Sequence, residues 1–189
     1  GLRAINVLGF NITIPHKVKT LSIIDHIDEL ALQIGAINTV KNEKGKFIGR
    51  NTDAEGFLLS LSENNIPFKE KSVIIIGAGG AAKAISFILG NKVKSMIIAN
   101  RTKKRLINLT DSLKLKFPIP IKPTLLKNAE KFKQEITQSD LIINCTSVGM
   151  NPNRNHSIIP KEILHSNHIV YDLIYSPLET KLLKDAKSK

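Results

Sequence analysis

The apolar positions of the first 66 residues follow mixed periods, which indicates short elements of more than one kind. Residues 9–14 form a β-branched stretch that ends at Pro15, and proline cannot donate to a strand ladder, so we expect a strand that stops there. Apolar residues then recur at near-helical spacing at Val18, Leu21, Ile24, Ile27, Leu30 and Ile34. This spacing predicts one or two amphipathic helices.

The next segment predicts a hairpin and a further helix. Residues 37–40 and 46–49 flank the turn sequence Asn42-Glu43-Lys44-Gly45. Thr52 begins the predicted helix, and Glu55 three residues later gives the spacing of a capping box. The polar run Asn64-Asn65-Ile66-Pro67 is the best domain boundary, so we expect one domain over residues 1–66 and another over residues 67–189.

After Pro67 the pattern changes to alternating strands and helices. Buried strands are predicted at 72–76, 95–99, 140–145 and 169–173, with a short one at 119–121. Helices are predicted at 77–89 and 102–115, and Ser176-Pro177-Leu178-Glu179 has the order of residues that starts another. The lysine-rich residues 125–138 give no clear prediction. The alternation predicts an α/β fold with a Rossmann-type, doubly wound parallel sheet.

Composition narrows the class of protein. No apolar run reaches the roughly 18–20 residues of a membrane span, and no signal-peptide pattern is present, so we expect no membrane partner. The one cysteine, Cys145, excludes an internal disulfide and fits the cytoplasm. Lys and Arg number 28 against 16 Asp and Glu, a net charge of +12. The lysines are spread along the chain and aromatic residues are 5%, which favours solvated helix surfaces over a nucleic-acid partner.

The strongest local motif is a glycine-rich loop between a buried strand and a helix. It reads Gly77-Ala78-Gly79-Gly80-Ala81-Ala82, the pattern G-x-G-x-x-A. The first glycine permits a tight turn, the second lets a pyrophosphate approach the backbone, and the small last residue lets the helix pack closely on the strand. The free N–H groups of the helix terminus suit phosphates. The motif therefore predicts a dinucleotide site.

The end of the following strand indicates which dinucleotide is bound. An acidic residue there would bind the ribose 2′-hydroxyl of NAD, but the strand ends Ala99-Asn100-Arg101-Thr102. Lys103, Lys104 and Arg105 follow. A guanidinium can bind a 2′-phosphate through two hydrogen bonds, so the run favours NADP over the alternative of plain surface charge.

Three clusters of polar residues precede the glycine loop. They are Gly9-Phe10-Asn11-Ile12-Thr13-Ile14-Pro15-His16-Lys17, Gly35-Ala36-Ile37-Asn38-Thr39 and Gly49-Arg50-Asn51-Thr52-Asp53-Ala54-Glu55-Gly56. Taken singly, each suits turns, caps and surface charge. Taken together and in this order, they resemble the shikimate dehydrogenase family. The runs Asn144-Cys145-Thr146-Ser147-Val148-Gly149-Met150 and Asp172-Leu173-Ile174-Tyr175-Ser176-Pro177-Leu178-Glu179-Thr180 extend the resemblance over essentially the whole chain.

The resemblance implies reversible reduction of 3-dehydroshikimate to shikimate by NADPH, in the biosynthesis of aromatic amino acids. By position, Lys17 and Asp53 resemble the catalytic pair, and which of the two is the formal acid-base stays open. Asn38, Asn51, Thr13 and Tyr175 resemble substrate ligands. The implied cofactor-binding residues are Gly77, Ala78, Gly79, Gly80, Ala81, Asn100, Arg101, Thr102, Lys103, Arg105, Thr146, Ser147, Val148, Gly149, Met150 and Leu173. We expect Cys145 to be a packing residue, no metal because the histidines lack ligand spacing, and allow for a homodimer.

The resemblance also implies segments that this sequence does not contain. Family members begin with a βαβ segment whose serines bind the substrate carboxylate, and they continue beyond the last helix with a glutamine that contacts substrate. We therefore expect residues 1–66 to be a partial substrate domain. Two alternatives stay open: a quinate/shikimate dehydrogenase that uses NAD, and a nucleotide-binding module without turnover. A glutamyl-tRNA reductase shares the glycine loop but would need a nucleophilic cysteine early in the chain, and Cys145 lies far too late.

Overall fold

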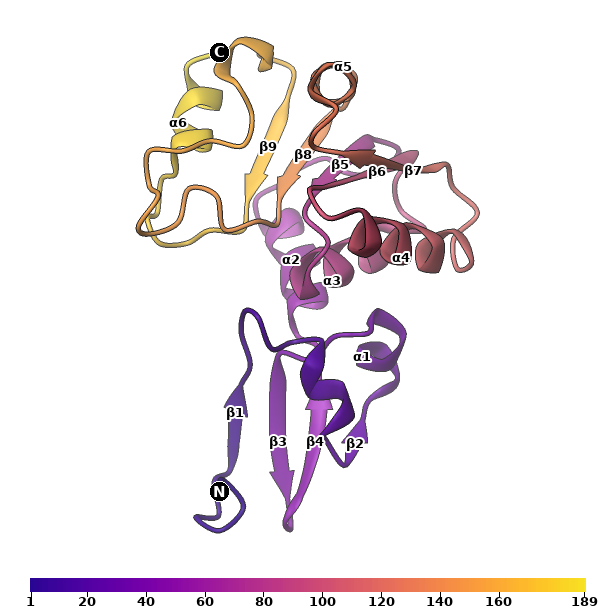
Figure 1. Ribbon diagram of the computed structural model, residues 1–189, viewed down its shortest axis with the longest axis vertical. Helices are drawn as coiled ribbons and strands as arrows, with labels where there is room; N and C mark the ends of the chain where they lie inside the picture. The colour runs from indigo at the N-terminus through magenta and orange to yellow at the C-terminus, as the bar shows by residue number, and fades with distance from the viewer. The chain divides into compact units, whose positions relative to one another are not determined.

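The computed structural model describes all residues 1–189, which divide into two compact units (Figure 1). The first unit consists of Gly1–Ile66 and Gly79–Ile88, and the second of Pro67–Ala78 and Leu89–Lys189. No helix in the chain is both long enough and apolar enough to cross a lipid bilayer.

The first unit contains a small four-stranded sheet. Its strands are β1 (Gly9–Asn11), β2 (His26–Ile27), β3 (Thr39–Glu43) and β4 (Lys46–Arg50), in the order β1-β3-β4-β2. Its helical elements are a 3₁₀ turn η1 (Lys19–Ser22), α1 (Glu29–Ile34), α2 (Asp53–Glu63) and most of α3 (Gly80–Leu89). The predicted hairpin is present as β3 and β4, which pair antiparallel around Lys44 and Gly45.

Two small apolar cores hold this unit together. The sheet core gathers Ile12, Ala31, Ile37, Val40 and Phe47. The second core joins α1, α2 and α3 through small side chains, with Ala36, Ala54 and Ala84 completely buried. Small residues let backbones approach closely, so the loop before β3 and the start of α2 are fixed against α3.

The first 34 residues are less helical than the apolar spacing predicts. Only α1 is an α-helix, because the Asp28 side chain accepts a hydrogen bond from Ala31 N at 2.7 Å and so caps the helix at that point. Ile27 instead lies in β2, which pairs parallel with β4. The predicted strand 9–14 is also shorter, because β1 pairs with β3 only over Gly9–Asn11.

The second unit is a five-stranded, entirely parallel sheet. Its strands are β5 (Ser72–Ile76), β6 (Ser95–Asn100), β7 (Ile121–Leu125), β8 (Leu141–Asn144) and β9 (Ile169–Asp172), in the order β7-β6-β5-β8-β9. Its helices are α4 (Lys103–Lys114), α5 (Ala129–Thr137) and α6 (Lys181–Lys187), with a 3₁₀ turn η2 (Lys161–Ile163). This is the doubly wound Rossmann-type order, so the predicted fold class is confirmed.

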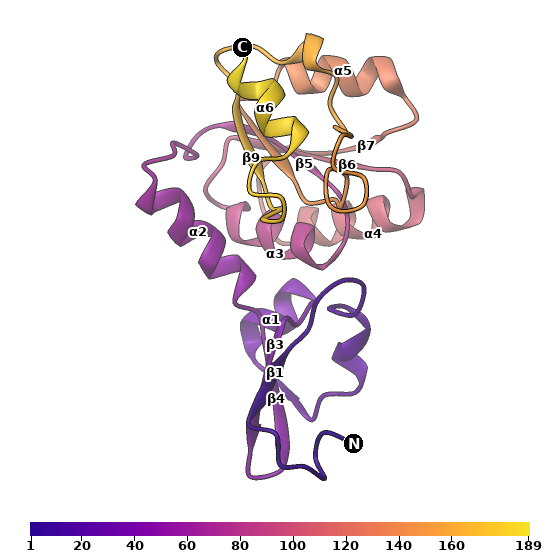
Figure 2. The same ribbon diagram turned by 90° about the vertical axis from the view of Figure 1, so that its left-hand side faces the viewer.

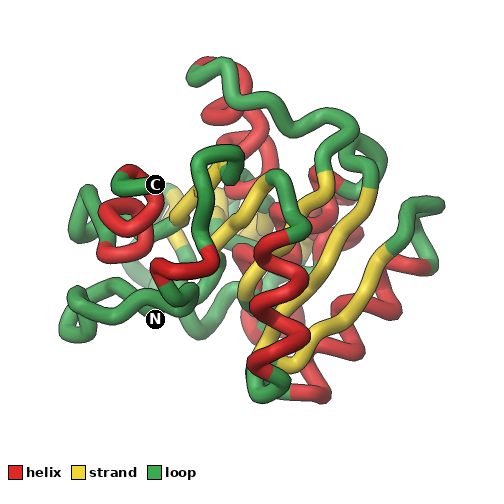
Figure 3. The backbone as a smooth tube through the Cα atoms, turned by 90° about the horizontal axis from the view of Figure 1, so that it is seen from above, coloured by secondary structure: helices red, strands yellow, loops and turns green.

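Helices cover both faces of the large sheet. Figure 2 shows α4 on one face and α5 and α6 on the other, and in Figure 3 helices of this unit (red) run beside its strands (yellow). β5 and β8 are therefore continuous apolar runs, with Ile74, Ile76 and Ile142 fully buried in one core with Phe132 and Leu182.

Two predictions in the second half need correction, and one undetermined stretch is now assigned. The predicted strand 119–121 is β7, which starts at Ile121 and lies at the sheet edge, where Pro123 is tolerated. The undetermined stretch 125–138 contains α5, capped by Asn128. The last helix begins later than predicted, because the Thr180 side chain, not Ser176, accepts from Leu183 N and caps α6.

Candidate active site and dinucleotide site

The first unit brings Lys17 and Asp53 into direct contact, although 36 positions separate them in the sequence. Lys17 Nζ donates to Asp53 Oδ2 at 2.7 Å. Lys17 lies in the loop after β1 and Asp53 is the first residue of α2. Their side chains are 16% and 25% exposed, so the pair is shielded from bulk water and still reachable. Lys17 and Asp53 therefore form an ammonium–carboxylate ion pair at the start of α2.

A carboxamide fixes the other oxygen of this carboxylate. Asn38 Nδ2 donates to Asp53 Oδ1 at 2.7 Å and to Thr52 Oγ1 at 2.9 Å. Asn38 Oδ1 accepts from Thr52 N at 2.9 Å and from Thr39 Oγ1 at 3.0 Å. Both Asp53 oxygens are thus bonded, and the carboxylate has little rotational freedom. Asn38 is 8% exposed.

Thr52 belongs to this network and sequence reasoning did not select it as a site residue. Its hydroxyl lies 3.2 Å from Thr39 Oγ1 and 2.9 Å from Asn38 Nδ2. The expected capping box is wrong, because Thr52 makes no side-chain cap bond. Its place between Asn51 and Asp53 in one run was the signal that could have identified it.

Asn51 and Thr13 occupy different surroundings. Asn51 is 3% exposed, and its Nδ2 donates to Ala36 O at 2.9 Å. Its Oδ1 accepts from Asp53 N at 3.1 Å and Ala54 N at 3.3 Å, so Asn51 supplies the first backbone N–H groups of α2 with an acceptor. Thr13 is exposed, and its carbonyl accepts from His16 N at 2.8 Å at the turn leading to Lys17.

The beginning of α3 packs against the Lys17 side chain. A Cβ atom added to Gly80 would lie 2.8 Å from Lys17 Cβ and 3.1 Å from Lys17 Cδ. Gly80 therefore provides the space in which the stem of Lys17 lies. A Cβ at the neighbouring Gly79 would meet no atom within 4 Å, so the backbone there is open to a bound group. Ala81 is half-buried at the same helix start.

In the second unit the glycine loop leaves β5 at the topological switch point. β6 and β8 flank β5, and the chain order reverses there, which is where doubly wound sheets bind ligands. Gly77 has φ +124° and donates its N–H to Ala99 O at 2.7 Å. A Cβ on Gly77 would lie 3.2 Å from Cys145 O, so only glycine fits between the ends of β5 and β8. Ala78 is buried beside it.

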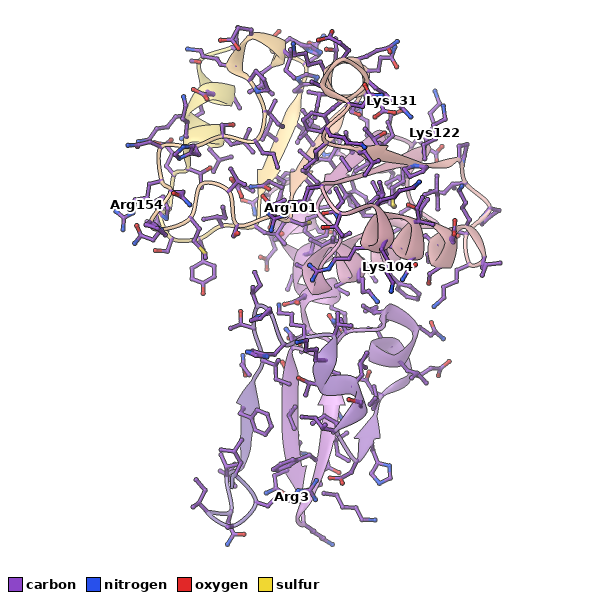
Figure 4. The ribbon with its side chains drawn as sticks, in the orientation of Figure 1. Arg3, Arg101, Lys104, Lys122, Lys131 and Arg154 are labelled. Carbon is purple, nitrogen blue, oxygen red and sulfur yellow. The ribbon has the colours of Figure 1, made fainter.

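The basic run lies at the carboxyl end of β6. Asn100 Nδ2 donates to Thr102 O at 3.0 Å, which shapes the turn into α4. The Arg101 side chain is exposed at the carboxyl end of the parallel strands, where β8 and β9 also end (Figure 4). Thr102, Lys103 and Arg105 are exposed as well. A cationic surface at this end of the sheet suits the anionic ribose end of a dinucleotide.

The loop after β8 is ordered by its own hydrogen bonds. Asn144 Oδ1 accepts from Thr146 Oγ1 at 2.8 Å, and Val148 N donates to Thr146 Oγ1 at 3.2 Å. Of the remaining predicted residues, Ser147 and Met150 are exposed, Gly149 is buried, Leu173 N donates to Asn144 O at 3.1 Å, and Tyr175 is 85% exposed. No three His, Cys, Asp or Glu side chains gather where they could hold a metal ion.

A doubly wound parallel sheet with a glycine loop at its switch point, preceded in the chain by a lysine–carboxylate pair, defines the class of dinucleotide-binding α/β proteins. Comparison of the sequence with models of known protein families identifies the family. The model described as "Shikimate dehydrogenase substrate binding domain" matches residues 1–40, and "Shikimate / quinate 5-dehydrogenase" matches residues 60–167. The chain belongs to the shikimate/quinate 5-dehydrogenase family.

Individual proteins agree with this assignment. A shikimate dehydrogenase (NADP(+)) of Caldanaerobacter subterraneus is 40% identical over 188 residues, which cover 99% of this chain and 66% of that protein. A crystal structure of a shikimate dehydrogenase with NADP+ superposes with a TM-score of 0.85 at 40% identity, covering 100% of this chain and 65% of the other. A quinate dehydrogenase from Corynebacterium glutamicum with NAD gives a TM-score of 0.85 at 29% identity, covering 99% and 66%. The chain spans about two thirds of the length of these relatives.

Proposed function

We propose that the protein is an NADP-dependent shikimate dehydrogenase, which reversibly reduces 3-dehydroshikimate to shikimate in aromatic amino-acid biosynthesis. The observation that carries the proposal is the Lys17–Asp53 pair, 2.7 Å apart and mostly shielded from water, in a chain of this family. The name of the 40% identical relative supports NADP and shikimate as cofactor and substrate. The single cysteine is in keeping with a reducing compartment such as the cytoplasm.

The residues present fit a bound dinucleotide. Gly79 has open space where a side chain would be, so a pyrophosphate can reach the backbone, and α3 begins at the next residue with free N–H groups. We assign Gly77 to Ala81 to the pyrophosphate, and Asn100 to Lys103 with Arg105 to the 2′-phosphate end. The residues Thr146 to Met150 and Leu173 would lie along the nicotinamide. When bound, NADPH supplies the hydride for the substrate carbonyl carbon.

The protein's own part of the reaction is proton transfer and orientation. In the reduction, the Lys17 ammonium gives a proton to the substrate carbonyl oxygen as that oxygen becomes a hydroxyl. Asp53 holds the ammonium by the hydrogen bond to Oδ2, and Asn38 holds Asp53 through Oδ1. In the oxidation the same Nζ removes the hydroxyl proton. We assign four residues to substrate binding: Thr13, Asn38, Asn51 and Tyr175. Asn51 contributes through the turn at the start of α2, which its hydrogen bonds hold in place.

The domain assignment is part of the proposal. Residues 1–66 would bind the substrate and residues 67–189 the dinucleotide. A homodimer is not required by any of these roles.

The experiment is an assay of 3-dehydroshikimate reduction by the native protein, with NADPH and NADH in parallel. We expect turnover with NADPH, and loss of about 10²- to 10⁴-fold in kcat for Lys17→Ala, the range typical of a positioned proton-transfer group. NADPH affinity should stay nearly unchanged, because Lys17 acts on the substrate oxygen. Asp53→Asn should lower kcat and alter the pH profile. A Lys17→Ala variant that keeps more than about a third of kcat would refute the assigned role.

The second candidate is a quinate dehydrogenase that uses NAD. It is favoured by the structural similarity to the quinate dehydrogenase solved with NAD, and opposed by Arg101 where NAD-selective sheets carry an acid. Oxidation of quinate with NAD⁺, measured beside oxidation of shikimate with NADP⁺, distinguishes the two. A higher kcat/KM for the first pair would make this second function the correct one.

A further inference from the structure

A partly buried carboxylate lies at the end of β9, outside the residues given catalytic or binding roles. Asp172 Oδ1 accepts from Asn144 Nδ2 at 3.0 Å and from Ile174 N at 3.1 Å, and Oδ2 accepts from Thr180 Oγ1 at 2.7 Å. Burial raises the pKa of the Asp172 carboxyl, although these three hydrogen bonds act in the opposite direction. Burial of a carboxyl group disfavours its charged form, so an acid kept at such a position indicates a role beyond packing.

On one side this carboxylate is connected to the loop after β8. Asn144 is completely buried, and its Oδ1 accepts from Thr146 N at 3.0 Å and Thr146 Oγ1 at 2.8 Å. Thr146 Oγ1 in turn accepts from Val148 N at 3.2 Å. Because Asp172 accepts from Asn144 Nδ2, it fixes which way the carboxamide faces, and Oδ1 is then directed at the loop.

On the other side the carboxylate is connected to α6. Thr180 is completely buried and is the N-cap of this helix, since its Oγ1 accepts from Leu183 N at 3.3 Å. A hydroxyl that accepts at the cap still has its proton to donate, and Asp172 Oδ2 receives it. A Cβ added to Gly149 would lie 3.6 Å from Thr180 Cβ, so the far end of the loop packs on the same residue.

We propose that Asp172 is a positioning residue for the loop Thr146–Met150, which it holds in place through Asn144 on one side and Thr180 on the other. The inference rests on the proposed function for the loop's role beside the nicotinamide. Its structural part, that Asp172 keeps this loop ordered, is independent of any substrate. A loop that is displaced by about 1 Å can cost on the order of 10²-fold in rate, so the network is expected to affect turnover without contact with the reacting atoms.

The chain carries a built-in probe of this loop. Cys145 is the only cysteine and lies between Asn144 and Thr146, so the rate at which a thiol reagent labels the native protein reports opening at this point alone. Asp172→Asn keeps the shape but places an N–H₂ group opposite the Thr180 hydroxyl. Thr180→Val removes the hydroxyl, and Thr180→Ser retains it. We expect about tenfold faster labelling of Cys145 in Asp172→Asn and Thr180→Val, and near-normal labelling in Thr180→Ser.

A matched control separates this effect from general loss of helix capping. Asn128 caps α5 by accepting from Lys131 N at 3.3 Å, at the opposite edge of the sheet from β9. Asn128→Ala should leave Cys145 labelling as in the wild type. The inference is overturned if Asp172→Asn and Thr180→Val label no faster than Asn128→Ala.

Steady-state kinetics then test the functional part. With 3-dehydroshikimate and NADPH, Asp172→Asn and Thr180→Val should each lower kcat by about tenfold, because the loop orients the cofactor end that reacts, whereas Thr180→Ser should keep a kcat near that of the wild type. If the wild type does not turn over this pair, the proposed function fails, whereas the labelling result still decides whether Asp172 orders the loop. Faster labelling with unchanged kcat would overturn the part of the inference that concerns turnover.

Discussion

At the scale of single residues, the arrangement of the Lys17–Asp53 pair depends on which of its side-chain atoms make hydrogen bonds within the protein. Asp53 has both oxygens hydrogen-bonded, one to Lys17 and one to Asn38, so the carboxylate is held in one orientation against the ammonium. Asn38, although 8% exposed, is the centre of this arrangement. Asn38 carries no charge, yet it is the residue that orients the Asp53 carboxylate.

Arg101 is the residue on which cofactor choice is expected to depend. Replacement by alanine should cost about 1.5–3 kcal/mol of binding, the range for hydrogen bonds to charged groups, and so weaken NADP binding roughly ten- to a hundredfold. NAD binding should change little, because NAD has no 2′-phosphate. Fluorescence titration of both dinucleotides measures the two constants. Equal losses for NADP and NAD would contradict the assignment.

Gly80 is expected to matter for turnover more than for cofactor binding. A methyl group there would lie 2.8 Å from Lys17 Cβ, close to the backbone, where the lysine cannot move away cheaply. Gly80→Ala should therefore displace Lys17 and lower kcat by on the order of 10²-fold. Gly79→Ala, where a Cβ meets no atom within 4 Å, is the matched comparison and should chiefly weaken dinucleotide binding. The kcat and the dissociation constant of NADPH for each variant decide the point.

At the scale of elements, the starts of helices show where tertiary contacts replaced the local pattern. Thr52 stands at the N-cap of α2 but gives its side chain to Asn38, and Asn51 provides the acceptor for the first N–H groups instead. Thr180 caps α6 and also donates to Asp172. At α6 one residue both caps the helix and binds Asp172, whereas at α2 Asn51 caps the helix and Thr52 binds Asn38.

The cap supplied by Asn51 can be measured as stability. Asn51→Ala removes two acceptor contacts at the start of α2 and leaves Ala36 O without its donor, so we expect a loss of about 1–3 kcal/mol in the free energy of unfolding. Thr52→Val, which removes a hydroxyl that makes no cap bond, should cost less. Urea unfolding of both variants tests the order. The assignment of the cap is wrong if Thr52→Val is the more destabilising.

At the scale of the whole molecule, the chain forms two units whose boundary does not follow the sequence. Gly79–Ile88 groups with the first 66 residues, so the chain passes from one unit to the other three times. The glycine loop itself contains one of these passages, since Ala78 and Gly79 belong to different units. The two halves of the dinucleotide motif therefore connect the unit that holds the Lys17–Asp53 pair with the unit that holds the large sheet.

The titration of His168 should contribute to the pH dependence of the free energy of unfolding. Burial, with a smaller contribution from the positive charge of His165, lowers the pKa of His168 below its ordinary 6.5. The rings of these histidines stack with centroids 3.5 Å apart. A lowered pKa means that the unfolded chain binds the proton more readily, so this contribution to stability is present above pH 6.5 and decreases as the pH falls from 6.5 toward the folded-state pKa.

Urea unfolding at several pH values between 5 and 8 measures this contribution. His168→Gln should flatten the decrease in the free energy of unfolding below pH 6.5, and His165→Gln should reduce it in part by removing one cause of the shift. A wild-type curve that does not differ in slope from the His168→Gln curve would contradict the prediction.

Most of the second unit could be predicted from the sequence. β5 matches its predicted bounds of 72–76, because a strand covered on both faces must be a continuous apolar run, and that requirement is local. The glycine pattern likewise follows from backbone demands that only glycine meets, as at Gly77. β7 and α5 were displaced or missed because an edge strand with a proline and a lysine-rich helix have weak local patterns.

The features that local sequence patterns do not predict lie mostly in the first unit and at the starts of helices. The apolar spacing of residues 18–34 suits a helix, but pairing of β2 with β4 and the Asp28 cap leave just six α-helical residues beside the 3₁₀ turn η1. The family resemblance points to Lys17, Asn38 and Asp53, but their mutual hydrogen bonds come from long-range packing that no local pattern encodes. Local patterns account for the fold class, and the family resemblance for the chemical types at the site. Tertiary structure determines which atoms meet, because hydrogen-bond partners distant along the chain are selected by how its elements pack.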